Sequence, residues 1–538
     1  MRQTPGSRRE KINVVGSSTF GRYNKISSER TINMFISDNW LINTAGYQRI
    51  YNFFPAGQGR GIFNSIRGNL LIVVVSSFVY ALDVNLVPTF IGNLATESGE
   101  VFIDENLSSQ ICIVDGLNAY IYNYSMPANL TVQALSGTLI PNYVEYHNTC
   151  FLFGNANRTP NGSAWYAYSF NSATTITQSA QFAIQTKPDY ALAIIRLPGQ
   201  GNNVLALGSS VGEIWTQVAG LQVYRRNATI NLDYGVLSVS TIAKSDKYVA
   251  WLGANESNQP VIMVYAGQGF TRISTDGIDY ELGQIKFPAQ STAMFYRQDG
   301  HLFYQLTFTN AADNKTYLYD FNTEKFFDLA DAHLNFHPAR EYVYFQGQSY
   351  FISLSNAALY ESSTNFTTYN ENLPTAIQDP TLNLEIQRIR ICDTLYSDDS
   401  SQNRYNSLVV TIEQGNDTAV TGVSLLGNED LLITEDMFVP PDDVIYTEFG
   451  VPIGDEDSGA GIGMGDLPPP YQPRVDLSIS RDAGITWSNT VSRNLNPVAI
   501  RQNILNWEGM GACNSFTPKF RFWGISRFVV NDGIVEIY

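Results

Sequence analysis

The sequence predicts an all-β protein: a β-propeller followed by a C-terminal domain of the β-sandwich type. The 538 residues include 31 Tyr, 30 Phe and 41 Gly, and aromatic side chains suit half-buried strands while Gly suits the tight turns between them. Strand-turn-strand patterns recur between about residues 56 and 372, where helical periodicity is nearly absent. Beyond residue 372 the composition changes, which indicates a further domain.

These patterns divide the chain into three parts. Residues 1–55 form an N-terminal segment that we expect to pack with the C-terminal β domain. Residues 56–372 form the propeller, and residues 373–538 form the C-terminal β domain. Within the last part we expect an acidic loop rich in Pro and Gly at 440–473 and a hairpin motif at 480–487.

Each repeated unit of the propeller has an apolar strand, a turn and a second strand that ends near an aromatic residue. The closing aromatics recur at intervals of 41 to 54 residues, close to the period of propeller blades. A blade is a small sheet that buries its faces only against its neighbours, so we expect six or seven blades. Unrelated hairpins in a large sandwich are the alternative. The closing residues are Tyr80, Tyr122, Tyr168, Trp215, Tyr265, Tyr319 and Tyr360.

The charge balance disfavours a nucleic-acid binder. The formal net charge is −17, from 50 acidic and 33 basic residues. Proteins that grip DNA phosphates gain affinity from basic residues that displace counterions, and a chain of this charge repels DNA. The same charge suits a surface past which DNA moves without specific binding.

No segment predicts a membrane span, a metal centre or a catalytic site. The most apolar run, Leu70 to Val75, is much shorter than the roughly 20 residues that cross a bilayer. His333 and His337 lie four apart, but Pro338 follows at once and favours a turn. The cysteines lack metal-binding or disulfide spacing, so we expect free thiols and neither metal nor cofactor. They are Cys112, Cys150, Cys392 and Cys513.

The acidic loop is a candidate gate or partner-binding loop. From Tyr405 to Pro473 the chain has 13 acidic residues and no Lys or Arg. Like charges, Pro and Gly disfavour regular structure, so a loop ordered by a partner and a solvated linker are equally supported. The candidate residues are Asp442, Asp443, Asp455, Glu456 and Asp457.

The stretch SRDAGITW, at 480–487, resembles the Asp-box hairpin of sialidase-type propellers and of many non-enzymatic β proteins. We expect Asp482 to accept N–H groups of its own turn, Gly484 to adopt positive φ and Trp487 to fill the adjacent core, while Ser480 belongs to the same hairpin. Farther on, the Asn-Asp-Gly sequence at 531–533 predicts a second hairpin between the last two strands.

A sialidase would also need clustered arginines and a nucleophile pair. The arginines are scattered instead, so we expect no catalytic residues and no enzyme. A glycan-binding or sialidase-like propeller stays as the alternative function. An interaction propeller of the eukaryotic type ranks last, because the blades lack Gly-His and Trp-Asp pairs. The scattered arginines are Arg22, Arg60, Arg196, Arg272 and Arg340.

Three stretches in the same order resemble the packaged-DNA stabilisation, or tail-hub (nozzle), proteins of short-tailed phages. SSERTINMF at 27–35 is similar to the Glu-Arg-x-x-Asn-x-aromatic stretch near the start of that family. WLGANESNQPVIMVYAGQGFTRIST at 251–275 resembles its mid-chain segment. The Asp box with NWEGMGACNSFTPKFRFWGIS at 506–526 is similar to its ending, although Ala483 replaces a common Gly.

The resemblance implies a structural protein of the virion tail, made in the host cytoplasm. In the family such proteins form a sixfold ring below the portal and its adaptor, close the DNA channel and open for ejection. The implied partners are further copies of the chain, the portal-adaptor ring, the tail needle or plug, and tail fibres or tailspikes. Structural roles fall on Trp251, on the Asp-box residues, and on Glu29, Arg30 and Asn33, which we expect to pair segments of the chain.

Overall fold

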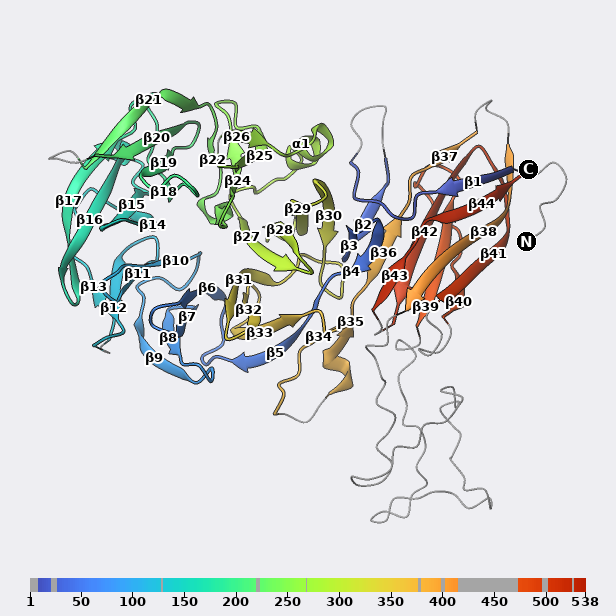
Figure 1. The fold of residues 1–538 in the computed structure, drawn as a ribbon, viewed down its shortest axis with the longest axis horizontal. Coiled ribbons are helices and arrows are strands. Elements are labelled where there is room, and N and C mark those ends of the chain that lie inside the picture. The colour runs from blue at the N-terminus through green and yellow to red at the C-terminus, as the bar shows by residue number, and fades with distance from the viewer. Residues whose placement is uncertain are drawn as a thin grey trace, which may run out of the picture.

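The computed structural model describes residues 8–20, 27–126, 129–218, 223–267, 269–375, 379–397, 402–414, 473–495, 502–524 and 527–538. These residues form a β-propeller and a β-sandwich that lie side by side (Figure 1). The described helices are short. They are α1 (Asp276–Leu282) and the 3-10 turns Pro160–Ser163, Val239–Thr241 and Pro380–Leu382.

The propeller has seven blades among the described residues, so the expectation of six or seven is confirmed. Blades 1 to 4 follow one another along the chain with four antiparallel strands each. Blade 1 has β6 (Gly59–Ser65), β7 (Leu70–Val75), β8 (Phe78–Leu82) and β9 (Pro88–Asn93). Blade 2 has β10 (Phe102–Glu105), β11 (Gln110–Val114), β12 (Ala119–Asn123) and β13 (Thr131–Val132). Blade 3 has β14 (Pro141–His147), β15 (Cys150–Asn155), β16 (Ala164–Ser172) and β17 (Thr175–Ala183), and blade 4 has β18 (Ala193–Arg196), β19 (Asn203–Leu207), β20 (Gly212–Gln217) and β21 (Tyr224–Leu232).

Blades 5 to 7 complete the circle. Blade 5 has β22 (Gly235–Val236), β23 (Ala243–Lys244), β24 (Val249–Ala254), β25 (Pro260–Tyr265) and β26 (Phe270–Arg272). Blade 6 has β27 (Ser291–Gln298), β28 (His301–Phe308), β29 (Lys315–Asp320) and β30 (Lys325–Leu329). Blade 7 has β31 (Ala339–Phe345), β32 (Gln348–Ser353), β33 (Ala358–Ser363) and, from the N-terminal segment, β5 (Gly46–Asn52).

Each closing aromatic of the sequence repeat lies on the third strand of its blade, from Tyr80 on β8 to Tyr360 on β33. Third strands carry the recurring aromatic residue because side chains that point toward a neighbouring blade enter the apolar core between the two blades. Separate buried apolar clusters fill the spaces between successive blades around the circle. A blade therefore buries its two faces against two different neighbours, and the circle is stable only as a whole.

The N-terminal segment is divided between the two domains. Its strand β5 pairs antiparallel with β33, so residues 46–52 form the outer strand of blade 7 rather than packing with the C-terminal domain. Strands β34 (Thr368–Asn370) and β35 (Asn383–Glu385) extend the same sheet beyond β5. Joining the last blade to a strand that precedes the first blade closes the circle with main-chain hydrogen bonds.

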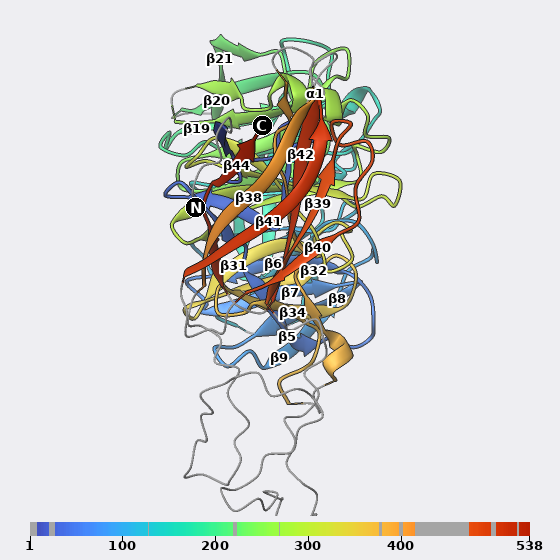
Figure 2. The same cartoon turned by 90° about the vertical axis from the view of Figure 1, so that its right-hand side faces the viewer.

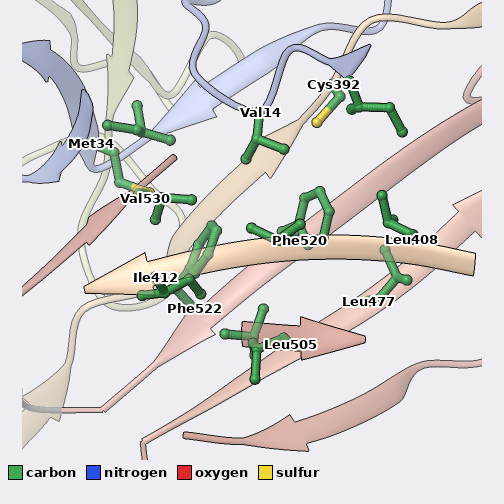
Figure 3. Packing of buried hydrophobic residues seen from close by; sticks show 14 of the residues in the cluster. Val14, Met34, Cys392, Leu408, Ile412, Leu477, Leu505, Phe520, Phe522 and Val530 are labelled. Carbon is green, nitrogen blue, oxygen red and sulfur yellow. The ribbon is translucent and has the colours of Figure 1, made fainter. Parts of the chain in front are cut away.

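The sandwich consists of two packed sheets. One sheet has β1 (Arg8–Ile12), β44 (Gly533–Ile537), β38 (Asn403–Gln414), β43 (Phe528–Val530), β4 (Trp40–Asn43) and β3 (Met34–Ser37), with β41 (Gln502–Cys513) on β38. The other has β36 (Arg388–Ile391), β42 (Ser515–Trp523), β39 (Arg474–Ser480) and β40 (Val491–Asn494), with β37 (Leu395–Tyr396) on β42. Figure 2 shows β38 and β41 of the first sheet and β42 and β39 of the second sheet at this end of the molecule. Phe520 and Phe522 from one sheet meet Leu408 and Ile412 from the other in the core (Figure 3).

A single short strand joins the two domains. β2 (Arg30–Ile32) pairs in parallel with β30 of blade 6 and antiparallel with β36 of the sandwich. Blade 6 and one sandwich sheet thereby form one continuous sheet, in the order β27-β28-β29-β30-β2-β36-β42-β39-β40. Main-chain hydrogen bonds therefore fix the sandwich to the propeller.

The predicted hairpin at 531–533 is wrong. β43 and β44 do not pair with each other: both lie along the same long strand, β38. Asp532 binds the N-terminal strand instead, because its carboxylate accepts the Val15 N–H at 2.9 Å and lies 2.6 Å from the Lys11 ammonium. The Asp532 side chain thus holds the N-terminal segment. The chain makes no reversal at 531–533, so β43 and β44 run in the same direction along β38.

Candidate functional site

The junction between propeller and sandwich gathers three of the residues predicted from sequence. Arg30 is the first residue of β2, the strand that joins the two domains, and Glu29 and Asn33 flank this strand. The Glu29 side chain contacts the sandwich, the Arg30 side chain contacts the propeller, and the Asn33 side chain contacts both. Their position makes this junction the candidate structural site.

Glu29 pairs with Arg390, whose side chain on β36 is fully buried. The Arg390 guanidinium also donates to main-chain carbonyl groups of the N-terminal segment, at 2.8 Å to Val14 O, 3.1 Å to Asn13 O and 3.0 Å to Ser17 O. One cation therefore holds three carbonyl groups within residues 13–17 of the incoming chain, and Glu29 neutralises it.

Arg30 faces the propeller. Its guanidinium carbon lies 3.9 Å from the centre of the Phe20 ring, and a terminal nitrogen lies 3.4 Å from a Glu281 carboxylate oxygen on α1. Arg30 also lies 4.0 Å from Asp328 on β30, where burial raises the pKa of that carboxyl group. Arg30 thus links the N-terminal segment to blade 6 and to the helix beside it.

Asn33 has a left-handed backbone, with φ 58°, and is fully buried. Its side-chain amide donates to Gln387 O at 2.9 Å, and its side-chain oxygen accepts the Ala330 N–H at 2.8 Å. Ala330 follows blade 6 and Gln387 precedes β36 of the sandwich. One side chain thus satisfies a main-chain group of each domain.

Arg388 and Arg390 are not among the residues predicted from sequence. Both are fully buried on β36, and Arg388 donates to Gly524 O at 3.1 Å and to Thr367 O at 3.0 Å. Burial lowers the pKa of Arg388 to about 10. The sequence did contain a signal for these two residues. Charged residues make up only 15% of the chain, and an Arg-x-Arg pair stands in an otherwise apolar strand. Alternate residues of a strand share a face, so the pair indicates two arginines on the same side of the sheet.

A second set of charges ties the blades together through their innermost strands. Glu145 on β14 is fully buried and pairs with Lys244 on β23 and, at 3.7 Å, with Arg196 on β18. Arg340 on β31 lies 3.2 Å from Glu100 and donates to Gly59 O at 2.8 Å. One group of charges thereby connects blades 3, 4 and 5, and a second connects blade 7 with blade 1 and with Glu100, just before blade 2.

Glu341 lies on β31 next to Arg340, and its buried carboxyl group is expected to destabilise the folded protein at high pH. Burial, with a smaller effect of nearby Glu100, raises the pKa of Glu341 to about 8, although its carboxylate accepts the Ile62 N–H at 3.3 Å. A raised carboxyl pKa favours the protonated folded form, so its cost is absent below the unfolded pKa and grows as pH rises toward the folded value. Glu341→Gln is therefore expected to raise the free energy of unfolding at pH 9 by about 1–2 kcal/mol.

Denaturant unfolding of Glu341→Gln at pH 5 and pH 9 measures this effect. At pH 5 the difference from the wild type should be much smaller than at pH 9, because pH 5 lies only just above the unfolded pKa and the cost of the buried carboxyl group has only begun to grow. Glu324→Gln removes an exposed carboxylate from blade 6 and serves as the control with no change at either pH. Equal effects of Glu341→Gln at both pH values would contradict the assignment.

Trp251 lies in the core between blades 4 and 5. It is fully buried on β24, and its indole N–H donates to Gly235 O at 3.1 Å. The same cluster contains Ile195 and Leu205 of blade 4. Trp251 therefore joins the faces of two neighbouring blades and satisfies its own polar group within blade 5.

The Asp-box hairpin has its predicted hydrogen bonds but not its predicted aromatic plug. Asp482 accepts the Ile485 N–H at 3.1 Å and the Thr486 N–H at 2.8 Å, and the Ser480 hydroxyl binds it at 2.6 Å. These hydrogen bonds lower the pKa of Asp482 to about 2, and Gly484 has φ 95°.

Trp487 was expected to fill the core, and this is wrong. The side chain is half-buried, and the Lys519 ammonium lies 4.4 Å from its ring centre. The side chain belongs to none of the buried apolar clusters of the described residues. Aromatic and aliphatic residues from β39 and β42 already fill the space between the sheets, so the ring packs on the outer side under a cation.

The carboxylate of Asp482 is expected to affect hydrogen exchange only in its own turn, where it accepts the Ile485 and Thr486 N–H groups. In Asp482→Asn the exchange rates of the Ile485 and Thr486 amides should rise roughly five- to tenfold near neutral pH, because a neutral amide accepts more weakly than a carboxylate. In the wild type the protection is complete above the unfolded pKa and is lost as pH falls toward about 2. Amide exchange measured by mass spectrometry tests this, with unchanged exchange in β24 as the internal control.

The candidate gate residues Asp442, Asp443, Asp455, Glu456 and Asp457 lie outside the described residues. In the described part of the chain, no three or more His, Cys, Asp or Glu side chains are grouped so that they could hold a metal ion. The four cysteines are buried and free. No helix of the described residues has the length and apolar character that crossing a membrane requires.

The fold and the junction define a class of protein: a β-propeller whose sixth blade continues into a β-sandwich, with buried ionic contacts that serve structure. The chain belongs to the phage stabilisation family described as bacteriophage P22 Gp10, beta-propeller, whose family model matches residues 28–364, more than half of the chain. The match begins beside Glu29 and ends with blade 7, so it covers the junction strand and the whole circle. No curated protein matches the chain.

Solved structures similar to this chain are propellers of several kinds. A streptogramin B lyase has 11% identity and a TM-score of 0.40, over 60% of this chain and 98% of that one. The Pan2 WD40 domain of Neurospora crassa has 9% identity and a TM-score of 0.38, over 64% and 98%. Virginiamycin B lyase of Staphylococcus aureus has 12% identity and a TM-score of 0.40, over 59% and 98%. At these values the similarities carry no argument about activity.

Proposed function

We propose that this protein is the tail hub, or nozzle, of a short-tailed phage. Copies of the chain form a hexameric ring below the portal and its adaptor. The ring closes the DNA channel, stabilises the packaged DNA and opens for ejection. The tail needle or plug and the fibres or tailspikes attach to it.

The family membership of residues 28–364 is the observation that carries this proposal. The continuous sheet through β2 supports it, because a ring subunit under the pressure of packaged DNA must transmit force between its domains without a flexible linker. The net charge of −17 supports it as well, because negative walls repel the DNA backbone and let DNA pass without specific binding.

A structural role without catalysis is part of the proposal. Two polar side chains at the centre of the junction are used within the protein: Arg390 by carbonyl groups and Glu29, and Asn33 by Ala330 and Gln387. Groups that are satisfied in this way hold the fold together, so neither side chain serves as a nucleophile or base. The proposal also assigns the protein to the virion tail, after synthesis in the host cytoplasm.

Electron microscopy of the protein mixed with a purified portal-adaptor complex tests the proposal. We expect closed rings of uniform copy number on the adaptor, and we expect filled heads without the protein to release their DNA. Single copies that ignore the portal-adaptor complex would overturn the proposal, as would stable filled heads in the absence of the protein. A fluorogenic sialoside assay and a glycan array test the alternative of a glycan-active propeller.

A further inference from the structure

Strands β17 and β21 lie at the end of the molecule far from the sandwich (Figure 1), and residues of these strands line a groove between blades 3 and 4. Its volume is about 590 Å³. One wall is the second half of β17, and the other is the first half of β21. The groove therefore lies between two outermost strands of the circle.

These two strands are unusual among the outer strands of the blades. β17 and β21 have nine residues each, whereas β9 has six, β26 has three and β13 has two. In the described residues β17 pairs only with β16, and β21 pairs only with β20. β17, with the sequence TITQSAQFA, contains neither a charged residue nor a proline, two of the devices that protect an exposed strand edge from pairing. A third device, the β-bulge, is present, because the pairing with β16 shifts register at Ser179 and near the start of the strand.

The floor of the groove is aromatic. Phe182 on β17 is half-buried, and its ring centre lies 5.5 Å from that of Trp215 and 5.7 Å from that of Tyr224. Trp215 and Tyr224 are 3% and 1% exposed, so they form a rigid base below Phe182. Such a base accepts the apolar side chains of a bound strand, which point to one face at every second residue.

The rim of the groove is cationic. The Arg225 side chain is exposed and makes neither a hydrogen bond nor an ion pair within the described residues, although its main chain pairs with Thr216 in the sheet. Arg226 lies 3.6 Å from Glu213, but that buried carboxylate already accepts the N–H groups of Gln185 and Thr186, at 2.8 and 2.6 Å. In a chain with a net charge of −17, two neighbouring arginines on a groove favour an acidic ligand.

We propose that this groove binds an extended, acidic polypeptide segment of a partner protein by strand addition to β17. Main-chain hydrogen bonds along the free edge provide affinity, and alternate side chains enter the groove above Phe182. A carboxylate of the ligand pairs with Arg225, since arginine and carboxylate form strong, charge-assisted hydrogen bonds. This inference does not depend on ring formation or on the proposed tail-hub function.

The probe for the test is a fluorescently labelled peptide of sequence DDVIYTEFG, which occurs at 442–450 of this chain. It combines β-branched and aromatic residues with three carboxylates, and main-chain pairing tolerates different side chains. Fluorescence anisotropy with the full chain at 50 mM salt is expected to show saturable binding. The neutral peptide NNVIYTQFG should bind at least about tenfold more weakly, and Arg225→Glu should weaken binding of the acidic peptide by at least about tenfold.

Arg297→Glu, at an exposed arginine on the other side of the circle, is the matched control and should bind like the wild type. Hydrogen exchange provides the second readout: amides of β17 should gain protection on binding, because a strand that pairs with its edge covers them. No binding up to 1 mM peptide, equal binding to Arg225→Glu, or binding without protection of β17 would each overturn the proposal. Displacement of the peptide by sialyllactose would overturn it in favour of a glycan site.

Discussion

Arg390→Leu is expected to lower the free energy of unfolding by about 3–5 kcal/mol, because breaking a buried ion pair leaves the remaining charge without compensation. The substitution removes the cation that pairs with Glu29 and the donor groups that serve the Asn13, Val14 and Ser17 carbonyl groups. The side chain of Arg390 is fully buried, so water does not replace those donors in the folded state. Urea unfolding, followed by tryptophan fluorescence, measures the loss.

Two further variants separate charge from geometry. Arg390→Lys keeps the charge but not the fork of donors, so it is expected to recover less than half of the loss. Arg297→Leu removes an arginine that is 58% exposed and paired with Asp246 on the surface, and its effect is expected to stay below about 0.5 kcal/mol. A loss at Arg390 as small as that at Arg297 would show that the buried cation does not hold the N-terminal segment.

The propeller was predictable because its signal repeats. Every blade needs an aromatic or aliphatic side chain at an equivalent place on its third strand, and Tyr80, Tyr122 and Trp215 meet that need at nearly regular intervals. Seven weak signals with one period reinforce one another, whereas a single hairpin in a sandwich has no repeat to support it. The sandwich was therefore predicted only in outline, from a change in composition and a few strand patterns, without the order of its strands.

The closure of the circle was not predictable from local sequence. Tyr360 on β33 pairs with Arg49 on β5, across almost the whole propeller in sequence. Nothing in the seven residues of β5 distinguishes an outer blade strand from a sandwich strand, because both expose one face and bury the other. The wrong prediction of a hairpin at Asn531 has the same cause. Both β43 and β44 pair with the long strand β38 instead of with each other, and the local sequence does not show that this strand is available.

At the junction, the sequence indicated the residues but not their partners. Glu29 and Asn33 were indicated by the resemblance of SSERTINMF to the opening stretch of the family, but Arg390 lies more than 350 residues from Glu29 in sequence. A buried arginine is recognised from sequence only by the apolar residues around it, and the same pattern fits an exposed edge strand. The groove between β17 and β21 had no sequence signal, since it arises from the spacing of two blades at their rim.

Asn33 is expected to show the second large effect, and a series of substitutions separates its two contributions. Asn33→Gly keeps the left-handed backbone, with φ 58°, but removes the hydrogen bonds to Gln387 O and from the Ala330 N–H. Two buried main-chain groups are left without partners, at about 1–3 kcal/mol each, so we expect a loss of about 2–4 kcal/mol. Asn33→Ala adds a side chain in the left-handed region and should lose a further ~1 kcal/mol.

Asn258 supplies the matched control because it has nearly the same backbone, with φ 55°, in an exposed turn. Comparing Asn258→Ala with Asn258→Gly isolates the left-handed strain, so that difference should equal the difference between the two variants at Asn33. Whatever remains at Asn33 is then the contribution of its two hydrogen bonds, which join the end of blade 6 to the start of β36. If Asn33→Gly unfolds at the same urea concentration as the wild type, β2 holds the sandwich to the propeller without this side chain.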